Sequence, residues 1–111
     1  MAAIYICGEV SAKDSGDTCP SLEKIKNKLK SMRCSVINPS ELPIMQLSWT
    51  DTMERRIEQL KKCQAVYVLP NWRESILARI ELTVAMDLRI ETIFHPASNK
   101  EIREIITSLG N

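Results

Sequence analysis

The sequence predicts an α/β fold, a three-layer sandwich with a mainly parallel sheet of four or five strands, of the flavodoxin-like or Rossmann-like kind. Short apolar, β-branched runs alternate with longer segments in which apolar residues recur every three or four positions. Strands joined by such helical crossovers are parallel as a rule. The length of 111 residues fits a single domain covering residues 1–111.

The first half of the chain contains two predicted strands with a helix between them. The run 3–7 is rich in β-forming residues and ends at Gly8. A polar loop follows, after which Pro20 suits the first turn of a helix. The second strand, 35–38, is stopped by Pro39. The helix between the two strands is expected to bury an apolar stripe formed by Leu22, Ile25, Leu29 and Met32.

A second helix connects these elements to a central strand. Thr50 or Asp51 can cap the helix, which we expect to run to about Lys62. The unbroken apolar run 65–69 is typical of a strand that is buried on both faces, and Pro70 ends it. The core-facing residues of the helix are expected at Met53, Ile57 and Leu60.

Ser75 is the expected N-cap of a third helix that ends near Asp87 or Arg89. Residues 91–94 form the expected fourth strand, and residues 99–109 the last helix. Inward-facing residues are expected at Leu77, Ile80, Val84 and Leu88 in the third helix, and at Ile102, Ile105, Ile106 and Leu109 in the last.

The composition narrows the possible partners. Fifteen basic and fourteen acidic residues give a net charge of +1, which argues against a nucleic-acid polymer or an acidic membrane as partner. No apolar run approaches the ~20 residues of a membrane span. Residues 1–10 lack the basic segment of a secretory signal, so we expect a cytoplasmic protein.

Cysteine and histidine spacing argues against a metal site. None of the four cysteines belongs to a C-x-x-C pair, and His95 is the single histidine. Disulfides are not expected in a reducing compartment. We therefore expect Cys7, Cys34 and Cys63 to be small buried residues in or beside strands, and no metal or other cofactor.

Parallel sheets of this kind bind ligands beyond the carboxyl ends of their strands, where the strand order reverses. Neither a G-x-G-x-x-G nor a G-x-x-x-x-G-K-[ST] phosphate loop occurs in the chain. Candidate substrate-binding residues are those that follow the first and third strands: Cys7, Gly8, Glu9, Ser11, Asn71, Trp72 and Ser75.

Three residues near the end of the third strand each allow two interpretations. Trp72 can form the wall of a pocket for a flat ring, or pack over the sheet end or against a second subunit. Ser75, at a helix start, can cap the helix or accept an anion or a sugar hydroxyl. Glu81 lies between Ile80 and Leu82, so it can point along the sheet surface; an exposed helix position is the commoner alternative.

A longer pattern covers about residues 3–95, and its most specific part is the stretch L-P-x-W-x-x-S-x-x-A-R-x-E at 69–81. With these residues the chain resembles the nucleoside 2-deoxyribosyltransferase-like superfamily, in particular a short branch known only as a domain of unknown function. The other matching segments are 4–8, 36–39, 41–43, 47–49, Met53, 63–69 and 90–94.

The resemblance implies cleavage of an N-glycosidic bond, or deoxyribosyl transfer, on a nucleoside or nucleotide, with Glu81 as the catalytic nucleophile. In this chemistry the carboxylate attacks the anomeric carbon, the base leaves, and a covalent glycosyl-enzyme forms. The loops after the first and third strands would hold sugar and base. The resemblance also implies a homo-oligomer.

The chain departs from the superfamily pattern at its usual carboxylates. Arg56 and Gln64 stand where acidic residues are usual, Glu9 stands where proline is usual, and Leu77 where glycine is usual. A positioned general acid contributes about 10²–10⁴-fold to such a reaction. The alternative function is therefore a non-catalytic binder that senses or sequesters a nucleotide-derived small molecule, and a third is a protein adaptor.

Overall fold

Four parallel strands form one sheet in the order β2-β1-β3-β4. The computed structural model describes residues 2–8, 22–38 and 48–109. The strands are β1 (Ala3–Cys7), β2 (Ser35–Ile37), β3 (Ala65–Val68) and β4 (Glu91–Phe94). The helices are α1 (Leu22–Lys30), α2 (Trp49–Lys61), α3 (Ile76–Asp87) and α4 (Asn99–Ser108), with a 3₁₀ turn, η2 (Trp72–Glu74).

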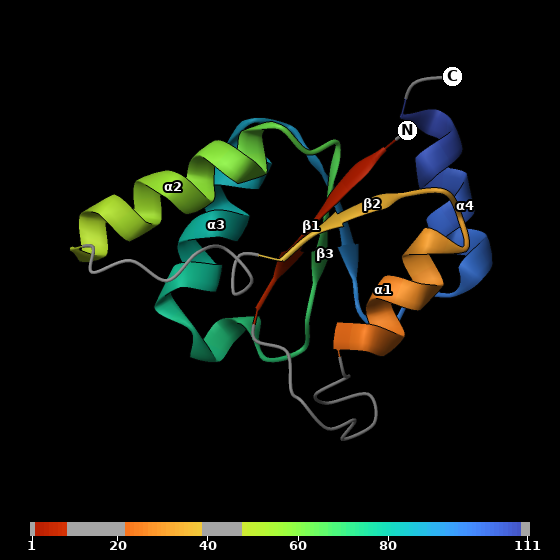
Figure 1. Ribbon diagram of the computed structural model, residues 1–111, viewed down its shortest axis with the longest axis horizontal. Coiled ribbons are helices and arrows are strands. Elements are labelled where there is room, and N and C mark those ends of the chain that lie inside the picture. Colours follow the sequence, from red (N-terminus) through yellow and green to blue (C-terminus); the bar gives the residue numbers. More distant parts are fainter. Residues whose placement is uncertain (1, 9–21, 39–47, 110–111) are drawn as a thin grey trace.

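The sheet lies between two helical layers, which confirms the predicted three-layer α/β fold. Helices α2 and α3 cover one face, and α1 and α4 cover the other (Figure 1). The chain passes from β1 to β2 on one side and later to β3 on the other side of β1. The strand order therefore reverses between β1 and β3, and a ligand crevice is expected at their carboxyl ends. No helix within the described ranges could span a bilayer.

Alternating side chains of the strands supply two separate cores. Ile4, Ile6 and Tyr67 face α1 and α4, whereas Tyr5 and Val66 face α2 and α3. All five are at most 1% exposed. This two-sided burial explains why the central strands appear in the sequence as unbroken apolar runs.

The element boundaries differ from the predictions mainly at α2. Its N-cap is Ser48, whose hydroxyl accepts a hydrogen bond from the Asp51 amide at 3.1 Å, so the predicted cap at Thr50 or Asp51 is wrong. Trp49 is the first residue of the helix. The predicted cap of α3 is confirmed, because the Ser75 hydroxyl accepts from the Ala78 amide at 3.2 Å. The expected start of the first helix at Pro20 lies outside the described residues.

The inward stripe predicted for α3 is confirmed only at Val84, which packs against the core beneath the helix. Leu77, Ile80 and Val84 are half-buried, and Leu88 is 48% exposed. Two apolar stripes overlap on this helix, and the small alanines of one stripe allow the helix to lie close against the sheet. The fully covered residues of α3 are Ala78, Glu81, Leu82 and Ala85.

Truncation of two leucines tests which stripe faces the sheet. We expect Leu82→Ala to lower the free energy of unfolding by about 2–5 kcal/mol, because it leaves a cavity in the core. Leu88→Ala, the matched control, should cost less than about 1 kcal/mol in dilute protein. Urea unfolding measures both values. Equal losses for the two variants would contradict the placement of α3.

Candidate functional site

The carboxyl ends of β1 and β3 meet closely at the switch point. Gly8 follows β1 with a φ of +118°, a conformation that L side chains rarely adopt. A Cβ at this position would lie 2.9 Å from the Asn71 amide oxygen and 2.9 Å from the Leu69 Cβ. The structure thus brings together Gly8 and Asn71, two of the predicted site residues. Glu9 and Ser11 lie outside the described residues.

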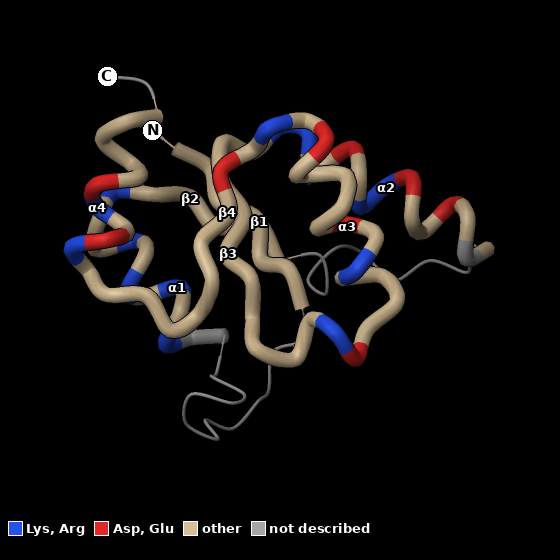
Figure 2. The backbone as a smooth tube through the Cα atoms, turned by 180° about the vertical axis from the view of Figure 1, so that it is seen from behind, with Lys and Arg blue, Asp and Glu red and all other residues tan. Residues whose placement is uncertain are grey.

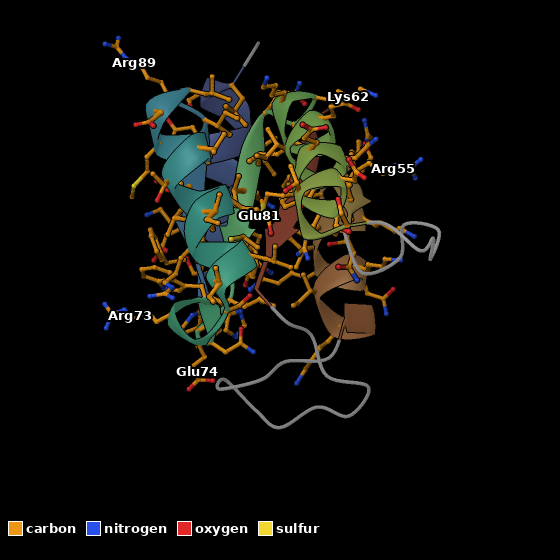
Figure 3. The ribbon with its side chains drawn as sticks, turned by 90° about the vertical axis from the view of Figure 1, so that its left-hand side faces the viewer. Arg55, Lys62, Arg73, Glu74, Glu81 and Arg89 are labelled. Carbon is orange, nitrogen blue, oxygen red and sulfur yellow. The ribbon has the colours of Figure 1, made fainter. Side chains whose placement is uncertain are left out.

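Glu81 has no exposed surface and is the one buried charged side chain in the described part of the chain. It projects from α3 into the layer between α3, α2 and the sheet (Figure 3). The exposed position considered from the sequence is therefore wrong. A polar residue on the sheet-facing stripe of α3 has lost its hydration, so its neighbours determine its charge state.

Arg56 of α2 is the partner of this carboxylate. Its Nη2 lies 3.0 Å from Glu81 Oε1, and its side chain is 17% exposed. Arg56 stands three residues after Met53 and four before Leu60, both buried, so it occupies the inward stripe of α2. The neighbouring Arg55 is exposed and points away from Glu81 (Figure 3).

Tyr5 of β1 is the third member of the site. Burial and then the negative charge of Glu81 raise the pKa of its phenol, so Tyr5 stays neutral. The hydroxyl is fully covered and near enough to interact electrostatically with Glu81 and Arg56, but it forms no well-aligned hydrogen bond with described residues. We call Tyr5, Arg56 and Glu81 the interlayer triad.

Opposing effects of burial and of two neighbouring side chains determine the charge state of Glu81. Burial raises the pKa of the carboxyl, while the Tyr5 hydroxyl and the Arg56 charge lower it; the net shift is upward. Glu81 Oε2 and Arg56 Nε have no hydrogen-bond partner among the described residues. The triad therefore retains both an acceptor and donors that a polar ligand atom could satisfy.

Three other predicted site residues serve the fold. Cys7 is fully buried, its thiol donates to the Ala78 carbonyl oxygen at 3.3 Å, and burial raises its pKa to about 12. The Trp72 ring is half-buried against the core, with the Arg73 guanidinium 5.3 Å from its centre. The Ser75 hydroxyl is engaged as a cap. Among the predicted site residues, Gly8 and Asn71 thus meet at the switch point, whereas Glu81 lies in the interlayer triad.

The expected burial of Cys7, Cys34 and Cys63 is confirmed, and none of the three forms a disulfide. No group of three or more acidic, Cys or His residues capable of holding a metal occurs in the described ranges.

Tyr5 and Arg56 were not predicted as site residues, although each is a polar residue within an otherwise apolar pattern. Tyr5 is the sole hydroxyl-bearing residue in the apolar run 3–7. Arg56 interrupts the inward stripe of its helix, which is unusual for an unpaired charge. Nothing in the sequence spacing, however, links either residue to Glu81.

Gln64 stands at the other position where the resemblance expects a carboxylate, and it lies outside the interlayer triad. Its side-chain oxygen accepts from the Ala3 amide at 2.6 Å, at the amino ends of the strands. His95, after β4, pairs its Nδ1 with the Tyr67 hydroxyl at 2.5 Å on the other face of the sheet. Neither residue contributes to the interlayer triad.

A family model for a domain of unknown function, DUF4406, matches residues 2–94, which run from β1 to the end of β4. The chain belongs to the DUF4406 family. The match covers all three residues of the interlayer triad and leaves α4 outside. No curated protein matches the DUF4406 chain.

Removal of Arg56 tests the buried ion pair. We expect Arg56→Met to lower the free energy of unfolding by about 3–5 kcal/mol at neutral pH, because it leaves an unpaired buried carboxylate. The pKa of Glu81 would rise further above its ordinary value of 4.5, so stability should be lost as pH rises beyond 4.5. The difference from the unaltered protein should shrink as pH falls toward 4.5.

Arg55→Met is the matched control, since Arg55 is exposed and adjacent. Its unfolding free energy should stay within about 0.5 kcal/mol of the unaltered protein at every pH. Parallel pH profiles for the two variants would show that the Arg56–Glu81 pair does not contribute to stability.

Substitution of Gly8 tests the close approach of the two loops. We expect Gly8→Ala to cost about 1–3 kcal/mol, because the positive φ strains an L residue and the new methyl meets Asn71 and Leu69. Chemical denaturation measures this loss. A stability equal to that of the parent would contradict the described conformation of Gly8.

Proposed function

We propose that the protein cleaves or transfers the N-glycosidic bond of a nucleoside or nucleotide, with Glu81 as the nucleophile. The observation that carries the proposal is the buried carboxylate on α3, held between Tyr5 and Arg56, with no hydrogen bond to Oε2 from the residues that the structure describes. A carboxylate removed from water and fixed by neighbours is suited to attack an electrophilic carbon.

The environment of Glu81 supports the chemistry that the resemblance implies. Its carboxylate would attack the anomeric carbon as the bond to the base breaks, and water or a second base would then take the sugar. The nucleophile must be ionised, and burial alone opposes this. The positive charge of Arg56 favours the ionised form, and its guanidinium lies against Oε1, whereas none of the described residues forms a hydrogen bond with Oε2.

The same ion pair supports a second candidate function. Where the resemblance expects an acidic residue, Arg56 supplies a permanent positive charge and cannot donate a proton to a leaving base. A binder needs no such donor. A paired Glu81 and Arg56 could instead recognise a ligand that offers a donor and an acceptor together, as a sugar hydroxyl does.

Access to Glu81 is part of either function. The carboxylate has no exposed surface, so covering side chains must move before a ligand atom reaches it. Slow association, or a requirement for a ligand large enough to separate α2 from α3, would be consistent with this burial.

The test uses a panel of ribonucleosides, deoxyribonucleosides and their monophosphates. We expect base release from at least one of them, and its reduction to the uncatalysed rate in Glu81→Gln, because an amide is a poor nucleophile at carbon. Glu74→Gln, at an exposed carboxylate on η2, is the matched control and should retain activity. Chromatography of the released base measures the rate.

Calorimetry with the same panel separates the two candidates. Binding without base release, lost in Glu81→Gln and kept in Glu74→Gln, would replace the enzymatic proposal by the binder. Neither turnover nor binding with any member of the panel would contradict both.

A further inference from the structure

Among the charged residues of α2, Arg56 is the one that turns inward. Charged positions occur along the whole length of this helix (Figure 2). The others are exposed, whereas the Arg56 side chain is 17% exposed and its Nη2 lies against the fully buried Glu81. A guanidinium has five N–H donors in one plane, and within the described ranges Nε of Arg56 has no hydrogen-bond partner. Arg56 therefore retains donors for a ligand that docks beside the carboxylate.

The direction of attack determines which part of a sugar lies next to these two side chains. A carboxylate that displaces the base of a β-nucleoside approaches the anomeric carbon, C1′, from the face opposite the base. As the bond from Glu81 to C1′ forms, the C1′–N bond breaks, and its electron pair leaves with the base, which takes a proton from water. The 2′-hydroxyl of ribose lies on the attacked face, on the carbon next to C1′. The 2′-hydroxyl of arabinose lies on the opposite face, and deoxyribose has none.

The ion pair offers the two partners that a 2′-hydroxyl needs. When Oε2 attacks C1′, Oε1 of the same carboxylate lies beside C2′. Arg56 Nη2 is 3.0 Å from Oε1, so the guanidinium is close to the same carbon. A hydroxyl can donate to Oε1 and accept from the guanidinium at the same time. An ionised acidic residue at position 56 would offer acceptors only, so the arginine adds the donor that the hydroxyl oxygen requires.

A 5′-phosphate is the other group of a nucleotide that an arginine commonly binds. The 5′ carbon projects from the same face of the ring as the base, and the attacking carboxylate lies on the opposite face. A guanidinium within hydrogen-bonding distance of that carboxylate is therefore much nearer to the 2′ position than to a 5′-phosphate. The position of Arg56 thus favours contact with the 2′-hydroxyl.

We propose that the substrate carries ribose rather than 2′-deoxyribose, and that Arg56 selects it by donating to the 2′-hydroxyl while Glu81 Oε1 accepts from the same group. This inference rests on the proposed function, because it needs a sugar docked against Glu81. It narrows the substrate class, since the resemblance alone implies deoxyribosyl compounds as well.

Nucleosides that differ only at C2′ test the inference on the unaltered protein. A riboside and the arabinoside of the same base have the same bonds and the same electron-withdrawing hydroxyl, which lies on opposite faces of the ring. We expect kcat/KM for base release to be about 10- to 100-fold higher for the riboside, because a hydrogen bond to a charged group contributes about that much. In calorimetry, the 2′-deoxy analogue should bind about 10-fold or more weakly than the riboside.

Arg56→Lys tests the role of the guanidinium. Lysine keeps the positive charge but has no planar fork, so one ammonium group cannot engage the carboxylate and the hydroxyl in the same geometry. The ratio of kcat/KM for riboside and arabinoside should fall to within about 3-fold of one. Arg55→Lys, at the exposed neighbouring position, is the matched control and should keep the ratio of the unaltered protein. Circular dichroism verifies that both variants are folded.

The outcomes separate this inference from the proposed function. Base release from the arabinoside at the rate of the riboside, tighter binding of the 2′-deoxy analogue, or a riboside preference that persists in Arg56→Lys would overturn the inference and leave the glycosidic activity standing. If the compounds bind without base release, their dissociation constants decide between the sugars in the same way. Neither binding nor base release with any of them would contradict the proposed function and the inference together.

Discussion

The buried ion pair between Glu81 and Arg56 is the interaction on which the α2–α3 half of the molecule depends. Removing a carboxylate from water is costly, and the cost is offset only if a partner of opposite charge is held beside it. Arg56 can be that partner because Met53 and Leu60 anchor α2 with this face inward. The pair thus fixes the position of α2 relative to α3 more specifically than apolar contacts would.

Helix α3 packs closely against the sheet and also buries a charged residue in the same layer. Small alanines on its inner side allow close approach to the sheet, and this leaves room for a glutamate in the same layer. Apart from Leu82, its larger apolar residues are half-buried or exposed. An aliphatic residue at position 81 would pack without a charged partner, so the glutamate makes the contact between α3 and α2 depend on Arg56.

Much of the fold was predictable because strands and helices differ in their hydrophobic period. The runs 3–7 and 91–94 agree with β1 and β4, and the Ser75 cap was found from its place before a periodic segment. The inward face of α3 was not predictable from hydrophobicity. Leucine and isoleucine are more hydrophobic than alanine and so dominate the pattern, whereas the smaller alanines allow the helix to approach the sheet more closely. Contacts between distant elements, such as Tyr5 with Glu81, leave no trace in local spacing.

The pairing of β1 with β3 has a consequence for biosynthesis. Ile4 lies opposite Ala65, so the central strand of the sheet meets its main neighbour only after sixty further residues have been made. Until then the most hydrophobic segment of the nascent chain has only the three-residue β2 to pair with. Pairing of β1 with its main neighbour must therefore wait for β3 to emerge from the ribosome, and this long-range pairing is expected to slow folding.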